Sequence, residues 1–96
     1  MMRVELFFGR SIGERGFVNQ SEWRAFERDV IARNFARGFT VLHAHGNWRD
    51  PRSGDTRRED SELVVIVTDD TESTREKIRR VTAEYKRRFR QEAVGI

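Results

Sequence analysis

The sequence contains no cysteine, one proline and only two histidines among its 96 residues. Without cysteine the chain has no disulfide, no thiolate nucleophile, no iron–sulfur cluster and no cysteine-ligated zinc. It also lacks an uninterrupted apolar stretch long enough to span a bilayer, and its first residues, MMRVELFFGR, hold only a short apolar run. We therefore expect a cytoplasmic protein that does not associate with membranes.

Lysine is scarce as well, because 17 of the 19 basic residues are arginines. The 16 acidic residues reduce the formal net charge to +3, which is small for a chain in which 36% of the residues are charged. The position of the charges therefore says more about partners than their total does. At this length we expect one domain, residues 1–96, whose core buries only about 60% of the unfolded surface, so that dimerisation would stabilise it.

Hydrophobic periodicity predicts alternating strands and helices. Val4, Leu6 and Phe8 recur with the period of a half-buried strand. Asn19 and Glu22 fit a capping box at the start of a helix that Gly38 ends, and Asp70 or Thr71 can cap a second helix. The predicted elements are strands at 3–8, 39–48, 61–69 and 92–96, a helix at about 20–36, and a second helix with the apolar stripe Ile78, Val81, Tyr85 and Phe89.

This order of elements, βαββαβ, predicts an α+β fold of the ferredoxin-like kind. Both helices pack on one face of a four-stranded antiparallel sheet with strand order 4-1-3-2. The segment 50–60, with the only proline and a balanced mix of charges, is expected to be a solvated connection between the second and third strands. The glycine-rich GRSIGERG is expected to be a flexible connection, since it matches neither common phosphate-binding glycine pattern.

The sheet face without helices is expected to be an interface. If Leu42 and Ala44 face the helices, alternation places the neighbouring side chains on the open face. That face then carries Glu5, Phe7, Val41, His43 and His45. Because an exposed apolar patch usually marks an interaction surface, we expect a homodimer packed sheet to sheet.

The two histidines, His43 and His45, point the same way on the predicted strand and have the spacing of a metal-binding pair. A third ligand is needed, however, and Glu5 lies two strands away, roughly 10 Å. We therefore predict no metal ion and no cofactor. A role for either histidine as a general acid or base remains open.

Nucleic-acid binding finds weaker support. The third strand, LVVIV, lacks the aromatic residues on which ferredoxin-like RNA-binding domains stack bases. The second helix is rich in arginine, but Glu76 and Glu84 interrupt its basic face. A solvated helix surface explains this pattern better than a phosphate-binding one, although nucleic acid or a protein partner stays an alternative.

Two polar segments, GNWRD and RREDSE, meet where the predicted hairpin ends. They place an aromatic ring, bidentate donors and a carboxylate together, which fits either a ligand site or a salt bridge that staples the loop. No serine has the context of a nucleophile elbow. The candidate ligand-binding residues are Arg10, His43, His45, Trp48, Arg49, Arg58, Glu59 and Ser61.

Five stretches, ELFFGRS, VNQSEWRAF, NFARGFTVLHAHGNWRD, REDSELVVIV and YKRRFRQEAV, make the chain resemble a bacterial family known as domain of unknown function 3574. The resemblance implies a compact α+β domain and no particular activity. It implies that His43 and His45 stand at positions that are not characteristically histidine. The residues that match the recurrent pattern are Phe8, Gly9, Arg10, Trp23, Phe26, Gly46, Trp48, Arg49, Glu59, Ser61, Tyr85, Phe89 and Gln91.

The activity itself cannot be assigned from these residues, and whether the protein is an enzyme stays open. Our first hypothesis is a homodimer that binds a small anionic molecule in a cleft near Arg10, Trp48, Arg49 and Glu59. One alternative is an enzyme of the dimeric α+β barrel kind that uses His43 or His45. Another is a nucleic-acid or protein-interaction module that uses the basic second helix.

Overall fold

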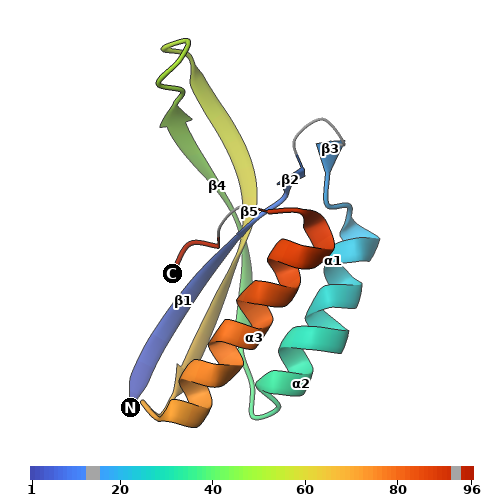
Figure 1. Ribbon diagram of the computed structural model, residues 1–96, viewed down its shortest axis with the longest axis vertical. Coiled ribbons are helices and arrows are strands. Elements are labelled where there is room, and N and C mark those ends of the chain that lie inside the picture. The colour runs from blue at the N-terminus through green and yellow to red at the C-terminus, as the bar shows by residue number, and fades with distance from the viewer. Residues whose placement is uncertain (13–15, 92–93) are drawn as a thin grey trace.

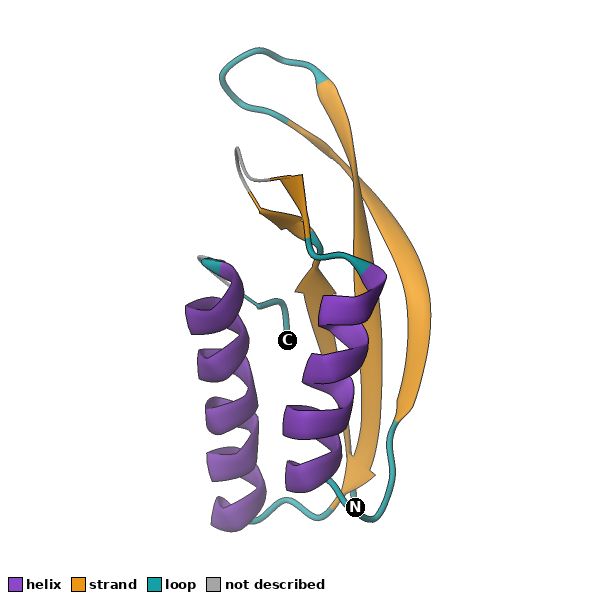
Figure 2. Cartoon of the chain, turned by 90° about the vertical axis from the view of Figure 1, so that its right-hand side faces the viewer, coloured by secondary structure: helices purple, strands orange, loops and turns teal. Residues whose placement is uncertain are grey.

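An antiparallel sheet and two helical segments form the two layers of the protein (Figure 1). The structure, a computed structural model, describes residues 1–12, 16–91 and 94–96, and the backbone alone of Trp48. Figure 2 shows both helical segments on the same side of the sheet. The α+β class is therefore as the sequence predicts. None of the helices described is long and apolar enough to cross a membrane.

Three strands make the main sheet, in the order β1 (Met2–Gly9), β5 (Thr56–Thr68) and β4 (Thr40–Arg49). In β1 every second residue from Val4 to Phe8 is buried, as the alternation predicts. Leu6 pairs directly with Val64 of β5. Directly paired residues share a face, so this register gathers the apolar side chains of both strands beneath the helices.

The fourth strand predicted at 92–96 is reduced to one bridge in the part of the chain that is described. Gly95 pairs with Phe7, with N···O distances of 2.8 and 3.2 Å, beside the free edge of β1. Residues 92–93 lie outside the described residues. An additional two-stranded ladder, β2 (Ser11–Ile12) with β3 (Gly16–Phe17), occupies the segment expected to be a flexible connection.

The first helical segment begins at the predicted capping box. The side chain of Asn19 accepts a hydrogen bond from the Glu22 backbone, and the side chain of Glu22 accepts one from the Asn19 backbone. The predicted single helix is divided into α1 (Gln20–Phe26), a π-helical turn, η2 (Glu27–Ile31), and α2 (Ala32–Asn34). The wider π turn changes the angular spacing along the segment, so that the adjacent residues Val30 and Ile31 both reach the core.

The second helix, α3 (Glu72–Phe89), is capped by Thr71, whose hydroxyl accepts a hydrogen bond from the Thr74 backbone. Its predicted stripe is confirmed, since Val81, Tyr85 and Phe89 are buried and Ile78 packs against the core from a partly buried position. The rings of this stripe join those of Phe8, Trp23 and Phe26, with centroids 4.8–6.1 Å apart. This aromatic cluster fixes the helices on the sheet.

The β4–β5 hairpin is longer than predicted. Thr56 to Asp60 belong to β5 and pair with β4, so the solvated connection covers only residues 50–55. Residues 45–60, which we call the arm, extend beyond the helices (Figure 1). Because both faces of the arm meet solvent, its sequence lacks the apolar alternation by which a strand is recognised.

The face prediction for β4 was wrong. Val41 pairs with Val64 and His43 pairs with Glu62, both of which face the helices. Leu42 therefore lies on the open face, where half of its surface is exposed, and Ala44 shares that face. Glu5 and Phe7 lie on the open face, as expected. The error arises because β4 is an edge strand that carries apolar side chains on both faces.

Candidate functional site

A hollow of about 450 Å³ opens between α1 and the helix-facing side of β4 and β5. We call it the Arg10 hollow. Its lining residues are Arg10, Gln20, Trp23, Arg24, Glu27, Val41, His43 and Glu62. It contains two of the predicted ligand-binding residues, Arg10 and His43, and several groups that the sequence analysis did not select.

Arg10 connects the residues at the base of this hollow through three hydrogen bonds. Its Nε and Nη2 donate to the backbone oxygen of Val18 at 3.0 and 2.9 Å, and its Nη1 donates to Glu62 Oε1 at 3.1 Å. The Glu62 side chain is only 6% exposed. A carboxylate at this depth needs a compensating charge, which Arg10 provides. Because its nitrogens are used in these contacts, Arg10 is a positioning residue for Glu62.

His43 is oriented by the same carboxylate. Its Nδ1 lies 3.1 Å from Glu62 Oε1, whereas its Nε2 lies 3.9 Å from the nearest oxygen of Asp60, beyond hydrogen-bonding distance. An ionised carboxylate only accepts hydrogen bonds, so Nδ1 carries the proton and Nε2 of the neutral ring keeps a free lone pair. With 58% of its side chain exposed, His43 can offer that lone pair to a bound molecule.

His45 is not part of this arrangement. It follows His43 on the same face of β4, but it belongs to the arm and is exposed. Within the described ranges no group of three His, Asp or Glu residues is placed to hold a metal ion.

On α1 and at the start of η2 the hollow is lined by charged groups that keep unused bonding capacity. Glu27 accepts a hydrogen bond from Trp23 Nε1 at 3.2 Å through one carboxylate oxygen. The exposed side chain of Arg24 has no hydrogen-bond or ion-pair partner in the part of the chain that is described. A bidentate donor, a carboxylate oxygen and the His43 lone pair therefore share one hollow.

Four of the residues predicted to meet at the end of the hairpin do not line the Arg10 hollow: Arg49, Arg58, Glu59 and Ser61. Arg49 Nε donates to the Gly54 backbone oxygen at 3.2 Å, so its contact across the loop is a hydrogen bond. Arg58 pairs with Asn47 in the arm and is exposed. The side chain of Trp48 lies outside the described part of the structure.

Glu59 and Ser61 line a second hollow of about 260 Å³, together with Gly9, Gly46 and other residues. Glu59 pairs with Gly46, and Ser61 pairs with Ala44, so both lie on the open face. Glu62 and His43 lie on the opposite, helix-facing side. The sheet itself therefore separates Glu59 from Arg10.

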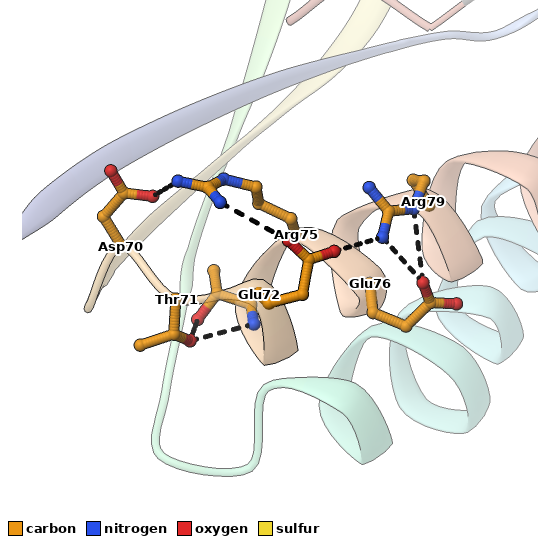
Figure 3. A network of polar contacts seen from close by, with 7 residues as sticks. Asp70, Thr71, Glu72, Arg75, Glu76 and Arg79 are labelled. Carbon is orange, nitrogen blue, oxygen red and sulfur yellow. Dashed lines mark hydrogen bonds and ion pairs between the residues drawn. The ribbon is translucent and has the colours of Figure 1, made fainter.

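The arginines of α3 are largely neutralised by neighbouring carboxylates, as Figure 3 shows at the start of the helix. Arg75 contacts Asp70 at 2.6 Å, and Arg79 contacts Glu72 and Glu76 at 2.9 and 2.8 Å. The hydrogen bond from Arg79 lowers the pKa of Glu72 below its usual value. These exposed pairs add little stability, but they reduce the positive charge available to nucleic acid.

Glu62 is a candidate site residue that the sequence analysis missed. Its signal was present, because alternation with Val64 and Ile66 directs residue 62 toward the core. A buried carboxylate within an apolar strand requires partners from elsewhere in the chain. Arg24 and Glu27 gave no comparable signal, since charged residues are ordinary on a helix surface.

Comparison with known proteins gives a family and a fold. The model of a family described as a protein of unknown function (DUF3574) matches residues 3–96. A solved structure, a phage SAM lyase in complex with S-methyl-5′-thioadenosine, superposes with a TM-score of 0.69 and 20% sequence identity. The match covers 96% of this chain and 74% of the lyase chain. No curated protein matches the sequence.

Proposed function

This chain belongs to the DUF3574 family of proteins of unknown function, and we propose that it binds a small molecule carrying a carboxylate in the Arg10 hollow. The observation that carries the proposal is the division of charge in that hollow. Arg10 compensates the buried Glu62, so the exposed Arg24 is the cation left to meet a ligand. A guanidinium pairs with a carboxylate through two parallel hydrogen bonds, which gives both affinity and orientation.

The other lining groups favour an amino-acid-like ligand. One oxygen of Glu27 accepts from Trp23, and the second can accept a hydrogen bond from an ammonium group. Arg24 and Glu27 lie three residues apart on one helical segment and line the same hollow. Together they match the two opposite charges of such a head group.

A matched pair of ligands tests this proposal. SAM carries a carboxylate and an ammonium group, whereas S-methyl-5′-thioadenosine carries neither. We expect SAM or glutamate to raise the melting temperature, because a ligand at 100 times its Kd adds about 2.7 kcal/mol to the free energy of unfolding. S-methyl-5′-thioadenosine should leave the melting temperature unchanged. Arg24→Gln should weaken binding about tenfold. Arg28→Gln, which removes an exposed cation from the same segment, is the control. Equal binding by both variants would contradict the proposed contact.

A second candidate function is an enzyme in which His43 moves a proton. The observation in its favour is the series Arg10, Glu62 and His43, in which a buried carboxylate fixes the imidazole and leaves Nε2 free. Mass spectrometry of the ligand recovered from the binding assay separates the two functions. Conversion that is lost in His43→Gln but kept in His45→Gln supports the enzyme, and an unchanged ligand supports binding alone.

We also propose that the domain is ferredoxin-like and pairs with a second copy through the open sheet face. The Phe7–Gly95 bridge occupies the edge where a fourth strand would lie. Phe7, Leu42 and Val67 expose 42%, 50% and 62% of their surfaces on the open face. Arg3 and Glu5 form an ion pair there, so the face has both charges and can pair with itself.

Light scattering across a concentration series tests the dimer. A stable interface covers about 800 Å² on each partner and has an apolar centre. Leu42→Glu places a charge in that centre, so we expect a mass near twice 11.4 kDa for the natural chain and a shift toward monomer for the variant. Ala83→Glu adds the same charge on the exposed side of α3 and should leave the mass unchanged. A natural chain that stays monomeric at every concentration would refute the dimer.

A further inference from the structure

A second charged hollow lies at the end of the molecule opposite the arm, and we propose that it binds the phosphate group of a small molecule. This hollow, the basal hollow, has a volume of about 480 Å³ and is formed where α2, the end of β5 and α3 meet. Arg33, Arg37 and Lys77 contribute to its lining. The Arg10 hollow shares none of its lining residues, so this proposal does not depend on the proposed carboxylate site.

Arg33, Arg37 and Lys77 differ from the many arginines of the protein that are paired with a carboxylate. Arg28, Arg75, Arg79, Arg87 and Arg88 each contact a carboxylate. Arg33, Arg37 and Lys77 have no hydrogen-bond or ion-pair partner among residues 1–12, 16–91 and 94–96. The hollow contains a single acid, Asp69. Among the lining residues three positive charges stand against one negative charge. The hydrogen bond from Arg28 and, more weakly, the charge of Arg33 lower the pKa of Asp29, which lies outside the hollow. The excess of positive charge suits a phosphate anion.

The backbone around these cations is held in place. Asn34 Nδ2 donates to the Val30 backbone oxygen at 2.8 Å, and its Oδ1 accepts from Arg80 of α3 at 3.1 Å. Phe35 is buried and ends α2, after which Gly38 turns the chain with a φ of 132°. Binding therefore needs to order only the long side chains, which lowers its entropic cost.

The apolar part of the lining indicates an organic phosphate. Ile66 is buried beneath the hollow, and Val67, at 62% exposure, stands at its rim. Cations that gather around one hollow with an apolar wall fit one phosphate and its attached carbon group. A nucleic-acid backbone would instead need a continuous basic stripe, which the ion pairs of α3 interrupt.

Phenyl phosphate is a suitable probe, and isothermal titration calorimetry measures its affinity. We expect one site per chain and a loss of about tenfold in affinity for each of Arg37→Gln and Lys77→Gln, because each removes a charged hydrogen bond. Lys86→Gln and Arg90→Gln remove exposed cations elsewhere and are matched controls. Absence of binding, or equal losses in all four variants, would overturn the proposal.

Amide chemical shifts locate the bound probe independently. Titration with phenyl phosphate should move the resonance of Gly38, beside the basal hollow, and leave that of Gly54, at the tip of the arm, unchanged. Lys77→Gln should also leave carboxylate binding at Arg24 intact, so failure of one site is distinguishable from failure of the other. A shift confined to residues of the Arg10 hollow would overturn the assignment to the basal hollow.

Discussion

Replacement of Arg10 by methionine is expected to lower the free energy of unfolding by about 3–5 kcal/mol, which is the usual effect of removing one partner of a buried ion pair. Arg10 is the cation within 3.1 Å of Glu62, whose side chain is 6% exposed. Methionine fills a similar volume but leaves the carboxylate without its compensating charge. The same change removes two hydrogen bonds to the backbone oxygen of Val18, the residue that follows β3. These bonds hold the end of the β2–β3 ladder beside Arg10.

Two further variants separate the buried charge from general disruption. Arg10→Met combined with Glu62→Leu removes both charges and should recover much of the lost stability. Arg28→Met breaks an exposed pair with Asp29 and should change stability by at most about 1 kcal/mol. Urea unfolding followed by tryptophan fluorescence measures all three. A double variant as unstable as Arg10→Met alone would show that Glu62 is not the cause.

The elements that could be predicted from the sequence are those in which apolar residues face one side only, or in which the capping contacts are made between close neighbours in the chain. Val4, Leu6 and Phe8 alternate because only one face of β1 is buried. Asn19 and Glu22 cap a helix through contacts within four residues of chain. In α3 the apolar stripe contacts a core that lies on one side only.

The remaining features depend on contacts between distant residues. Which side chains of β4 face the helices follows from its register with β5, in which Val41 pairs with Val64. The sequence of β4 does not determine this, because the strand carries apolar residues on both faces. Glu62 meets Arg10 across 52 positions of sequence, a separation that no local pattern reveals. Within one chain Arg10 and Glu59 line different hollows. The odd spacing between Glu59 and Glu62, the partner of Arg10, places those two side chains on opposite faces of the sheet.

Alkaline unfolding is expected to coincide with ionisation of Tyr85, the single tyrosine of the chain. Burial raises the pKa of its phenol above the ordinary value, because a phenolate would lose its hydration inside the aromatic cluster. The neutral phenol also donates to the Gly9 backbone oxygen at 2.6 Å. This hydrogen bond joins α3 to the end of β1, and it is lost when the phenol gives up its proton.

The direction of the pH effect follows from proton counting. Above about pH 10 the phenol of the unfolded chain has lost its proton, whereas that of the folded chain still holds it. The free energy of unfolding is therefore constant with respect to this group below pH 10 and falls as the pH rises further. Phenolate absorbance and circular dichroism should therefore change together. Tyr85→Phe should lose about 1 kcal/mol at neutral pH, through the missing hydrogen bond to Gly9, and show a weaker decline above pH 10. Ionisation near pH 10 in a chain that keeps its circular dichroism would contradict the buried position of Tyr85.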